Sequence, residues 1–338
     1  MDKVTYPKVS FIIPTLNEEK NIARCLQAIR TQDYPPDKIE IIVADGGSTD
    51  KTVEIAKSFG AHVVKNIIKH QEPGKTMAAK HATGDMLFYT DADNVLARNT
   101  WLKLMTKPYM DDPTIMGFLP QTIPAPDTNS MDKYFGYLCT EPFTWFVYGH
   151  ATTPRDYGNL YTPIKQTGSY RLYQFPSNNH PLLGLAQGFG TNKHFKRDEE
   201  ASGDDITAGI RIVEQHGKIA YVPNAGIYHY HINDLNNFIR KYTWRVKNNL
   251  SQTVKKMGLT HRKQYYSSIR KIRMGLFIPY ALTVVFPTID AIRMSIRFHD
   301  PVMLWHIPLS WILAVIIIKE TVSFYLCRNT KPLGLYEK

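Results

Sequence analysis

Residues 9–19 read VSFIIPTLNEE, residues 39–52 read IEIIVADGGSTDKT, and residues 85–94 read DMLFYTDADN. Each stretch begins with a short apolar run that reads as a buried strand and then passes directly into polar residues. Helical spacing of apolar residues fills the intervals, so strand and helix alternate along the first hundred residues. This order predicts an α/β fold with a mostly parallel sheet, in which ligands bind where the strands end.

Polar side chains follow these runs at what would be one edge of the sheet. Four residues come directly after the first run: Pro14, Thr15, Asn17 and Glu18. Asn17, with acidic residues after it, also suits the N-cap of a helix expected at 22–29. Asp45 ends the second run beside two glycines, which permit close approach of a ligand. We therefore expect these side chains to line one crevice.

Asp91 and Asp93 follow the third run with a single residue between them. Two carboxylates spaced in this way can share one divalent ion or divide metal and ribose between them. Hard carboxylate oxygens suit Mg²⁺ or Mn²⁺, with a substrate diphosphate completing the coordination. Many surface turns carry the same spacing, so this prediction depends on the neighbouring strand ends.

The net charge of +11 comes from one segment. Residues 240–273 hold eleven Lys or Arg and no Asp or Glu, which leaves 30 of the 41 basic residues to balance 30 acidic ones. A nucleic-acid-binding protein would also be basic, but that class leaves the carboxylates and the apolar tail unexplained. The segment reads instead as basic amphipathic helices attracted to anionic membrane lipids.

Two charge-free apolar stretches follow, at 274–289 and 302–318. Both are near the lower limit of roughly 17–25 residues for a membrane span. They predict a short transmembrane helical hairpin, with two buried helices as the alternative. Arg293 and Arg297 between the stretches run against the usual excess of positive charge on the cytoplasmic side, which leaves an interfacial first helix open.

Residues 117–184 are rich in Pro, Tyr and Asn and show no long periodic segment, so they are interpreted as a functional loop system. The three cysteines are far apart and form no CxxC pair. That usage predicts neither a disulfide framework nor a zinc site, and it fits a reducing compartment.

The segments SFIIPTLNEE, IIVADGGSTDKT, PGKTMAAKHATGD and LFYTDADN, in this order, resemble glycosyltransferase family 2 enzymes of the GT-A fold. The resemblance continues in GFGTNKHFKR and GDDITAGIRIVEQHGKIAYVPNA and covers residues 9–231. Among membrane-associated members, the chain looks like dolichol-phosphate mannosyltransferase-like and minimal cellulose-synthase-like enzymes. The resemblance implies a Rossmann-like sheet flanked by helices, followed by amphipathic interface helices and a short transmembrane hairpin.

On the donor side, the resemblance implies a role for each strand-end residue. Four would line the nucleotide pocket: Pro14, Thr15, Asn17 and Glu18. Asp45 would hydrogen-bond the base, and Lys75 would lie near the donor. Asp91 would contact the ribose and the metal, and Asp93 would ligate the metal, with His229 as a further metal or diphosphate ligand or else a structural histidine.

On the acceptor side, Asp204 and Asp205 occupy the place of an acidic pair whose second member is usually the base. Asp205 is therefore the predicted catalytic residue, and Asp204 is assigned to acceptor binding. Gly190 and Thr191 resemble the loop that holds the acceptor end.

Two departures from the family pattern affect the prediction. Gly46 stands where many relatives have a second Asp, which bears on base recognition. The Gln-x-x-Arg-Trp signature of processive members is incomplete around Trp244. That residue is then either an acceptor-stacking residue or an interfacial anchor.

The resemblance implies inverting, metal-dependent transfer of a hexose from a nucleotide sugar to a lipid-linked acceptor. The favoured donor is GDP-mannose and the second is UDP-glucose, with Mn²⁺ or Mg²⁺ as cofactor. A single-sugar addition in glycolipid or N-glycan precursor synthesis is expected. The alternatives are a polyprenyl-phosphate hexose synthase, a processive polysaccharide synthase and an inactive nucleotide-binding membrane scaffold.

The expected organisation has four parts. A catalytic domain at 1–232 precedes basic interface helices at 233–273, membrane helices at 274–327 and a tail at 328–338. The expected location is the cell membrane, with the catalytic domain on the cytoplasmic side. Expected partners are the nucleotide sugar, a lipid-linked acceptor and anionic lipids but no nucleic acid, and a homo-oligomer is left open.

Overall fold

The computed structural model describes residues 5–176, 188–195, 207–230, 232, 234–254 and 266–327. Two compact units emerge: residues 1–123 with 153–229, and residues 124–152 with 230–338. The segment 124–152, counted with the catalytic domain in the sequence prediction, packs with the C-terminal residues.

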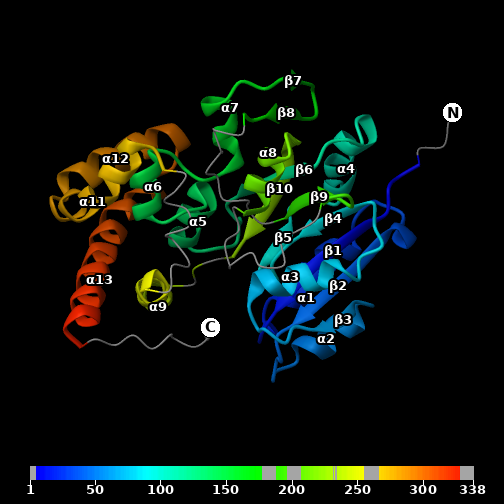
Figure 1. The fold of residues 1–338 in the computed structure, drawn as a ribbon, viewed down its shortest axis with the longest axis horizontal. Coiled ribbons are helices and arrows are strands. Elements are labelled where there is room, and N and C mark those ends of the chain that lie inside the picture. The colour runs from blue at the N-terminus through cyan, green and yellow to red at the C-terminus, as the bar shows by residue number, and fades with distance from the viewer. Residues whose placement is uncertain are drawn as a thin grey trace. The chain divides into compact units, whose positions relative to one another are not determined.

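The N-terminal unit contains all the described strands (Figure 1). Their bounds are β1 Val9–Thr15, β2 Ile39–Asp45, β3 His62–Lys65, β4 Met86–Tyr89, β5 Asn94–Leu96, β6 Gly117–Ile123, β7 Lys165–Gln166, β8 Arg171–Gln174, β9 Phe189–Asn192 and β10 Lys218–His229. Its helices are α1 Ile22–Arg30, η1 Pro36–Lys38, α2 Thr52–Ser58, α3 Gln71–Ala79, α4 Trp101–Asp111, η2 Pro154–Asp156, α7 Tyr157–Leu160 and α8 Thr207–Glu214.

The strands form one mixed sheet in the order β3-β2-β1-β4-β9-β6-β10-β8-β7, and β5 pairs with β10. The run from β3 to β4 is parallel, as the βαβα order predicts. Beyond β4 the sheet is mixed and not mostly parallel, because β9 pairs antiparallel with both β4 and β6, while β6 and β10 pair parallel. Strand β8 also pairs antiparallel with β10.

Both faces of the sheet are buried, which explains the unbroken apolar runs of its strands. On one face, Phe11 and Phe88 pack with the side chains of α1 and with Trp101 of α4. On the other face, Ile12 and Ile42 lie in a second cluster with residues of α3 and α8. The parallel strands are thus the middle layer of three, and their ends emerge between the helical layers.

The C-terminal unit is helical. Its elements are α5 Ser130–Leu138, α6 Pro142–Tyr148, α9 Leu235–Val254, α11 Ser268–Leu282, α12 Val285–Phe298, η3 Pro301–Trp305 and α13 His306–Cys327. Helix α13 packs against α9, α11, α12 and α6 around one apolar core.

Structured elements replace the loop system predicted at 117–184. The described part of this range contains β6, α5, α6, α7, β7 and β8. In α5, Met131, Tyr134, Phe135 and Leu138 are all buried, and their spacing is that of an amphipathic helix. The loop prediction is wrong because the helices and strands of this range are short and rich in aromatic residues. The helical spacing of apolar residues is present in the sequence but extends over few turns.

A transmembrane hairpin is not confirmed. Among the described residues, one helix, 301–326, is long and apolar enough to cross a membrane, and 44% of its most apolar window is buried inside the protein. The first predicted span is broken into α11 and α12, which meet at 97°. The break has a local cause: the ring of Pro287 is incompatible with a continuous helix through residue 283, and Val284 takes a left-handed φ of 60°.

Candidate functional site

The carboxyl ends of β1, β2 and β4 meet at one edge of the sheet, as the sequence predicts. Thr15 is the register partner of Asp45 across the β1–β2 pair. Strand β4 pairs with the other side of β1, and the Thr90 amide donates to the carbonyl of Ile12. The turn that carries Asp91 and Asp93 therefore begins beside the end of β1.

The loops after β1 and β2 are joined by hydrogen bonds. The Asn17 side chain accepts from the Thr49 amide at 2.9 Å, and the Asn17 amide donates to Ser48 Oγ at 2.9 Å. Asn17 has a φ of 55°, which Asn tolerates better than most residues. The prediction that Asn17 caps the first helix is wrong, because α1 begins at Ile22, after an N-cap at Asn21, and the Asn17 side chain bonds across to the second loop instead.

Asp45 is 7% exposed, and its carboxylate organises its own turn. Oδ2 accepts from the amides of Gly47 and Ser48 at 2.9 and 3.0 Å. Oδ1 accepts from Ser48 Oγ at 2.5 Å and from Thr15 Oγ1 at 3.2 Å. These four donors match the acceptor capacity of a carboxylate, so the Asp45 side chain holds the loop rigid. The resemblance implies that the base of the nucleotide binds at this point.

Lys75, which the resemblance places near the donor, lies at the strand-end carboxylates. It projects from α3, and its Nζ is 3.1 Å from Glu72 Oε1 and 3.2 Å from Asp91 Oδ1. Gln71 Nε2 also donates to Asp91 Oδ1. The three α3 residues share one helix face through i, i+3 and i, i+4 spacing, which is the sequence signal that could have identified Gln71 and Glu72.

Strand pairing brings His229 to Asp93. Strand β5 starts directly after Asp93, and Asn94 is the antiparallel partner of His229 in β10. As a result, His229 Nε2 lies 3.6 Å from Asp93 Oδ1, and both side chains are largely buried. Two predicted metal ligands more than a hundred residues apart are therefore adjacent.

Cys25 of α1 lies behind this cluster, a placement that sequence reasoning missed. Its thiol is 3.6 Å from the carbonyl oxygen of Asp91, and the residue is 2% exposed. Burial raises the pKa of the Cys25 thiol, and the charges of Asp93, Asp91 and Glu18 raise it further. Cys25 is therefore a neutral thiol. Because three acidic side chains raise its pKa, all three must lie near it, at the same edge of the sheet.

The donor set fits a hard divalent cation of the kind that keeps several ligand positions for substrate. Among the described residues, no group of three or more His, Cys, Asp or Glu side chains could hold a metal. The Asp93–His229 pair could supply two ligands, with Asp91 beside it in the same turn. Mg²⁺ is typically held by one or two carboxylates together with substrate phosphates, and two protein ligands are consistent with that mode.

The loop predicted at Gly190 and Thr191 is a strand in the structure, and their acceptor-binding role stays a prediction. Both residues lie in strand β9, between β4 and β6, and Thr191 is completely buried. A Cβ at Gly190 would lie 2.5 Å from a ring carbon of Phe88, so the glycine serves the packing of the sheet. Close contact between neighbouring strands is therefore the physical reason for a glycine at this position.

The remaining acceptor-side predictions fall elsewhere. Trp244 lies on α9 of the C-terminal unit and is partly buried. Asp204 and Asp205 lie outside the described residues. The catalytic role of Asp205 therefore stays a prediction.

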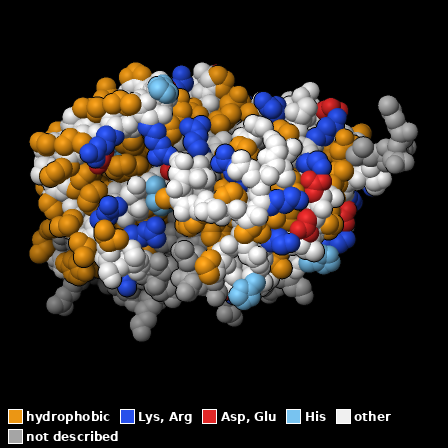
Figure 2. Space-filling view, turned by 90° about the horizontal axis from the view of Figure 1, so that it is seen from above, with side chains coloured by type: hydrophobic (Ala, Val, Ile, Leu, Met, Phe, Trp, Pro, Cys, Tyr) orange, Lys and Arg blue, Asp and Glu red, His pale blue; other side chains and the backbone are white. Residues whose placement is uncertain are grey.

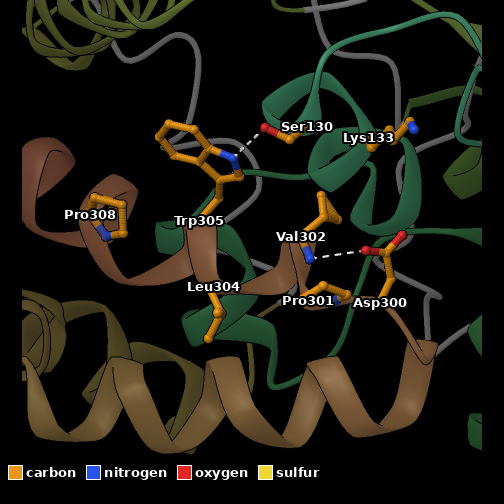
Figure 3. A pocket seen from close by; sticks show the side chains of 8 residues that line it. All are labelled: Ser130, Lys133, Asp300, Pro301, Val302, Leu304, Trp305 and Pro308. Carbon is orange, nitrogen blue, oxygen red and sulfur yellow. Dashed lines mark hydrogen bonds between the residues drawn. The ribbon is translucent and has the colours of Figure 1, made fainter.

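A separate pocket of about 570 Å³ lies in the C-terminal unit (Figure 3). Its lining residues are Ser130, Lys133, Asp300, Pro301, Val302, Leu304, Trp305 and Pro308. Trp305 Nε1 donates to Ser130 Oγ at 2.9 Å, and Asp300 accepts from the amide of Val302 at 3.0 Å. These polar groups satisfy one another, and the pocket lacks the converging carboxylates of the strand-end cluster.

Residues 10–174 match the model of the family described as Glycosyl transferase family 2. Glycosyltransferase AglE of Haloferax volcanii is 40% identical over 95 residues, which are 26% of this chain and 31% of AglE. A dolichyl N-acetyl-alpha-D-glucosaminyl phosphate 3-beta-D-2,3-diacetamido-2,3-dideoxy-beta-D-glucuronosyltransferase of Methanococcus voltae is 44% identical over 84 residues, or 23% of this chain and 26% of that protein. The matched stretches thus span less than a third of either relative.

Solved structures are similar over much more of the chain. The mannosyltransferase PcManGT from Pyrobaculum calidifontis, in complex with GDP-Man and Mn²⁺, has a TM-score of 0.53 at 16% identity. The superposition covers 96% of this chain and 89% of the PcManGT chain. S. aureus TarS 1–349 in complex with UDP-GlcNAc has a TM-score of 0.50 at 14% identity, covering 95% and 92%. At such identities the similarity concerns the fold alone. Residues 10–174, just under half of the chain, are thus similar to glycosyl transferase family 2, and the chain shares the mixed α/β fold of these GT-A-like neighbours.

Proposed function

We propose that the protein transfers a sugar from a nucleotide-sugar donor to a lipid-linked acceptor at the cytoplasmic face of a membrane. The observation that carries this proposal is the strand-end cluster, in which Lys75 bridges Glu72 and Asp91 while Asp93 lies against His229. Ligands of open α/β sheets bind at this edge, and cationic and metal-ligating groups there are suited to a diphosphate.

The loop residues support the nucleotide end of the proposed site. The crossed loops hold Asn17 and Asp45 rigidly beside Thr15, and the Glu18 amide donates to Thr52 Oγ1 at 2.7 Å. In our proposal Pro14, Thr15, Asn17 and Glu18 line the nucleotide pocket. Asp45 shapes its floor by holding the turn, and it would hydrogen-bond the base by exchanging one of its four donors, such as the Ser48 hydroxyl, for an N–H of the base.

Lys75 is the proposed electrostatic partner of the leaving diphosphate. Its ammonium lies between two carboxylates, so it can turn from Asp91 to a phosphate oxygen while it keeps its contact with Glu72. A preorganised cation of this kind stabilises charge that develops as the glycosidic bond to the diphosphate breaks. Asp93 and His229 would supply two ligands to Mn²⁺ or Mg²⁺, and Asp91 would join them by turning its carboxylate from Lys75 and Gln71. The ion would supply further charge neutralisation when bound.

Asp205 is the proposed general base. It would remove the proton of the acceptor hydroxyl as that oxygen attacks the anomeric carbon from the side opposite the diphosphate, which inverts the configuration. Positioned base catalysis is worth roughly 10²- to 10⁴-fold. Asp204 and Trp244 would contribute to acceptor binding.

The donor and acceptor are proposed from the relatives and the resemblance together. GDP-mannose is the leading hexose donor, and UDP-linked sugars are the alternative because relatives are named for glucuronosyl and N-acetylglucosaminyl transfer. The dolichyl phosphate named for the Methanococcus voltae relative supports a lipid-linked acceptor and a single-sugar addition to a glycolipid or N-glycan precursor.

The test is donor turnover by the purified full chain. Detergent-solubilised protein is incubated with a panel of GDP- and UDP-sugars, Mn²⁺ or Mg²⁺ and membrane lipid extract, and the released nucleoside diphosphate is measured. We expect release from one donor, loss of release with EDTA, and at least about 10²-fold slower release for Asp205→Asn. Equal rates for wild type and Asp205→Asn would overturn the assigned base, and no turnover of any donor would favour a nucleotide-binding scaffold.

A further inference from the structure

Helices α11 and α12 each carry two apolar sides. The inner sides are buried in the core of the C-terminal unit through Phe277, Tyr280 and Ala281 on α11 and through Pro287, Ala291 and Met294 on α12. The outer sides expose a second stripe: Ile269, Ile272 and Leu276 on α11, and Val285, Ile289, Ile292 and Ile296 on α12. These residues recur at three- and four-residue intervals, so each stripe follows one helix face.

This exposure is concentrated in one part of the chain. Of the twenty-four large hydrophobic side chains that the described residues expose, seventeen lie between Ile269 and Leu326, and five lie in the N-terminal unit. In the view of Figure 2, hydrophobic side chains gather at the left, over the C-terminal unit, with Lys and Arg among them. Single exposed apolar residues are ordinary on a protein surface, whereas a patch of this extent marks an interaction surface.

The elbow between the helices is the most apolar part of that surface. Leu282, Val284, Val285 and Phe286 are 45%, 44%, 60% and 55% exposed. From Ile272 to Ile292 the structure exposes no charged side chain. The one acid in this range, Asp290, is turned inward and accepts from the Tyr280 hydroxyl at 2.9 Å.

Positive charge lies at the far end of both arms. Lys271 near the start of α11 and Arg293 and Arg297 near the end of α12 are exposed. Between residues 268 and 298 there are five basic residues and a single acid. An apolar stripe bordered by cations complements an anionic lipid surface, and it does not complement a second copy of the same cationic face.

We infer that the α11–α12 elbow is an in-plane anchor that enters one leaflet of an anionic membrane without crossing it. The apolar stripes and the elbow lie about 5–10 Å deep, at the boundary of headgroups and acyl chains, as for other interfacial helices. Because the helices turn by 97° instead of continuing, both cationic ends remain at the headgroups of the same leaflet. This arrangement removes the conflict that Arg293 and Arg297 create for a spanning hairpin. The inference deepens the membrane location contained in the proposed function, and vesicle binding can be measured without catalysis.

Vesicle flotation of the full chain tests the anchor. Vesicles of phosphatidylcholine alone are compared with vesicles in which one third of the lipid is phosphatidylglycerol. Val285→Asp with Phe286→Asp should weaken binding to the anionic vesicles at least about tenfold, because two exposed side chains lose their apolar burial. The matched control is Ile164→Asp, a residue 54% exposed in the N-terminal unit, which should bind as wild type does.

The charged ends are tested separately. Lys271→Gln with Arg293→Gln should weaken binding roughly 30-fold, and only on anionic vesicles at low salt, since each charge near the surface contributes about fivefold. Lys57→Gln with Lys65→Gln, two exposed lysines of the N-terminal unit, is the control. Donor turnover in detergent should be unchanged in every variant, so a failed anchor leaves the proposed transferase standing.

Topology distinguishes an anchor from a span. In proteoliposomes, a membrane-impermeant maleimide should modify Lys271→Cys and Arg297→Cys from the same side, measured against the background of the parent protein. Modification from opposite sides would establish a spanning hairpin and overturn the proposal. It would also be overturned if Val285→Asp with Phe286→Asp left vesicle binding intact, or if that variant abolished only self-association of the protein in solution.

Discussion

In the N-terminal unit, a set of largely buried charged side chains gathers at one edge of the sheet, whereas in the C-terminal unit a set of buried polar side chains forms a chain through the middle of a helical core. At the strand ends, Lys75, Asp91 and Asp93 remain partly accessible, between 10% and 17% exposed. In the helical core, His306 is fully buried between Tyr134 and Tyr280. The first arrangement leaves charged groups available to a ligand, and the second closes every polar group upon another.

The hydrogen bonds that link Tyr134, His306, Tyr280 and Asp290, the core chain, have one consistent direction from donor to acceptor. The Tyr280 hydroxyl donates to Asp290 at 2.9 Å, so its oxygen accepts from His306 Nε2 at 3.0 Å. His306 Nδ1 is then free to accept from the Tyr134 hydroxyl at 2.7 Å. A neutral imidazole satisfies both bonds, and burial lowers the pKa of His306 to about 3. Buried polar groups therefore specify packing in one unit and chemistry in the other.

The largest effect is expected from the strand-end cluster. Asp93→Asn should slow donor turnover by roughly 10²- to 10³-fold, because it removes a carboxylate from the site where diphosphate charge is neutralised. The release of nucleoside diphosphate is the measurement, with the thermal midpoint as a check on folding. Asp37→Asn, an exposed acid in η1, is the matched control and should leave turnover unchanged. An active Asp93→Asn protein would mean that this cluster is structural, as the core chain is.

The core chain should affect how stability depends on pH, and not substrate turnover. The pKa of His306 is about 3 in the folded protein and 6.5 for an ordinary histidine. Between these values the unfolded chain binds a proton that the native protein does not, so stability is fully present above pH 6.5 and falls as the pH drops towards 3. Thermal unfolding followed by circular dichroism between pH 7 and pH 4 measures this loss.

The matched variant is His306→Phe. It should lower the free energy of unfolding by about 1–3 kcal/mol at pH 7, because the buried Tyr134 hydroxyl loses its His306 partner. It should also flatten the acid dependence between pH 7 and pH 4. An unchanged acid slope would assign the effect to other groups and would weaken the contrast between the two units.

A change of similar size, confined to stability, is expected at Gly190, which the resemblance assigns to the acceptor loop and the structure places in the sheet. Gly190→Ala should cost about 1–3 kcal/mol of stability, because its Cβ would lie 2.5 Å from Phe88. Chemical unfolding measures this cost, and Phe88→Leu in the same chain should recover part of it. A loss of transfer activity without a loss of stability would return Gly190 to the acceptor site.

Much of the N-terminal unit could be predicted because its signals are local. The apolar runs ending at Thr15, Asp45 and Tyr89 predict parallel strands, and parallel strands bring their carboxyl ends to one edge. The adjacency of His229 and Asp93 could not be derived from spacing, because it depends on the pairing of β5 with β10 across more than a hundred residues. The resemblance suggested His229, and strand pairing is the physical reason it lies there.

The C-terminal unit was harder to predict because one property, apolar content, serves both a buried core and an exposed face. The sequence by itself determined the alternation of strands and helices from β1 to β4, the edge at which the carboxylates meet, and the positive charge bordering the apolar tail. Only the tertiary structure decided that β9 runs antiparallel beside β4, that Gly190 and Thr191 lie inside the sheet, and that residues 274–289 break into an elbow. These outcomes depend on which surfaces meet over long sequence separations, and local periodicity carries no information about that.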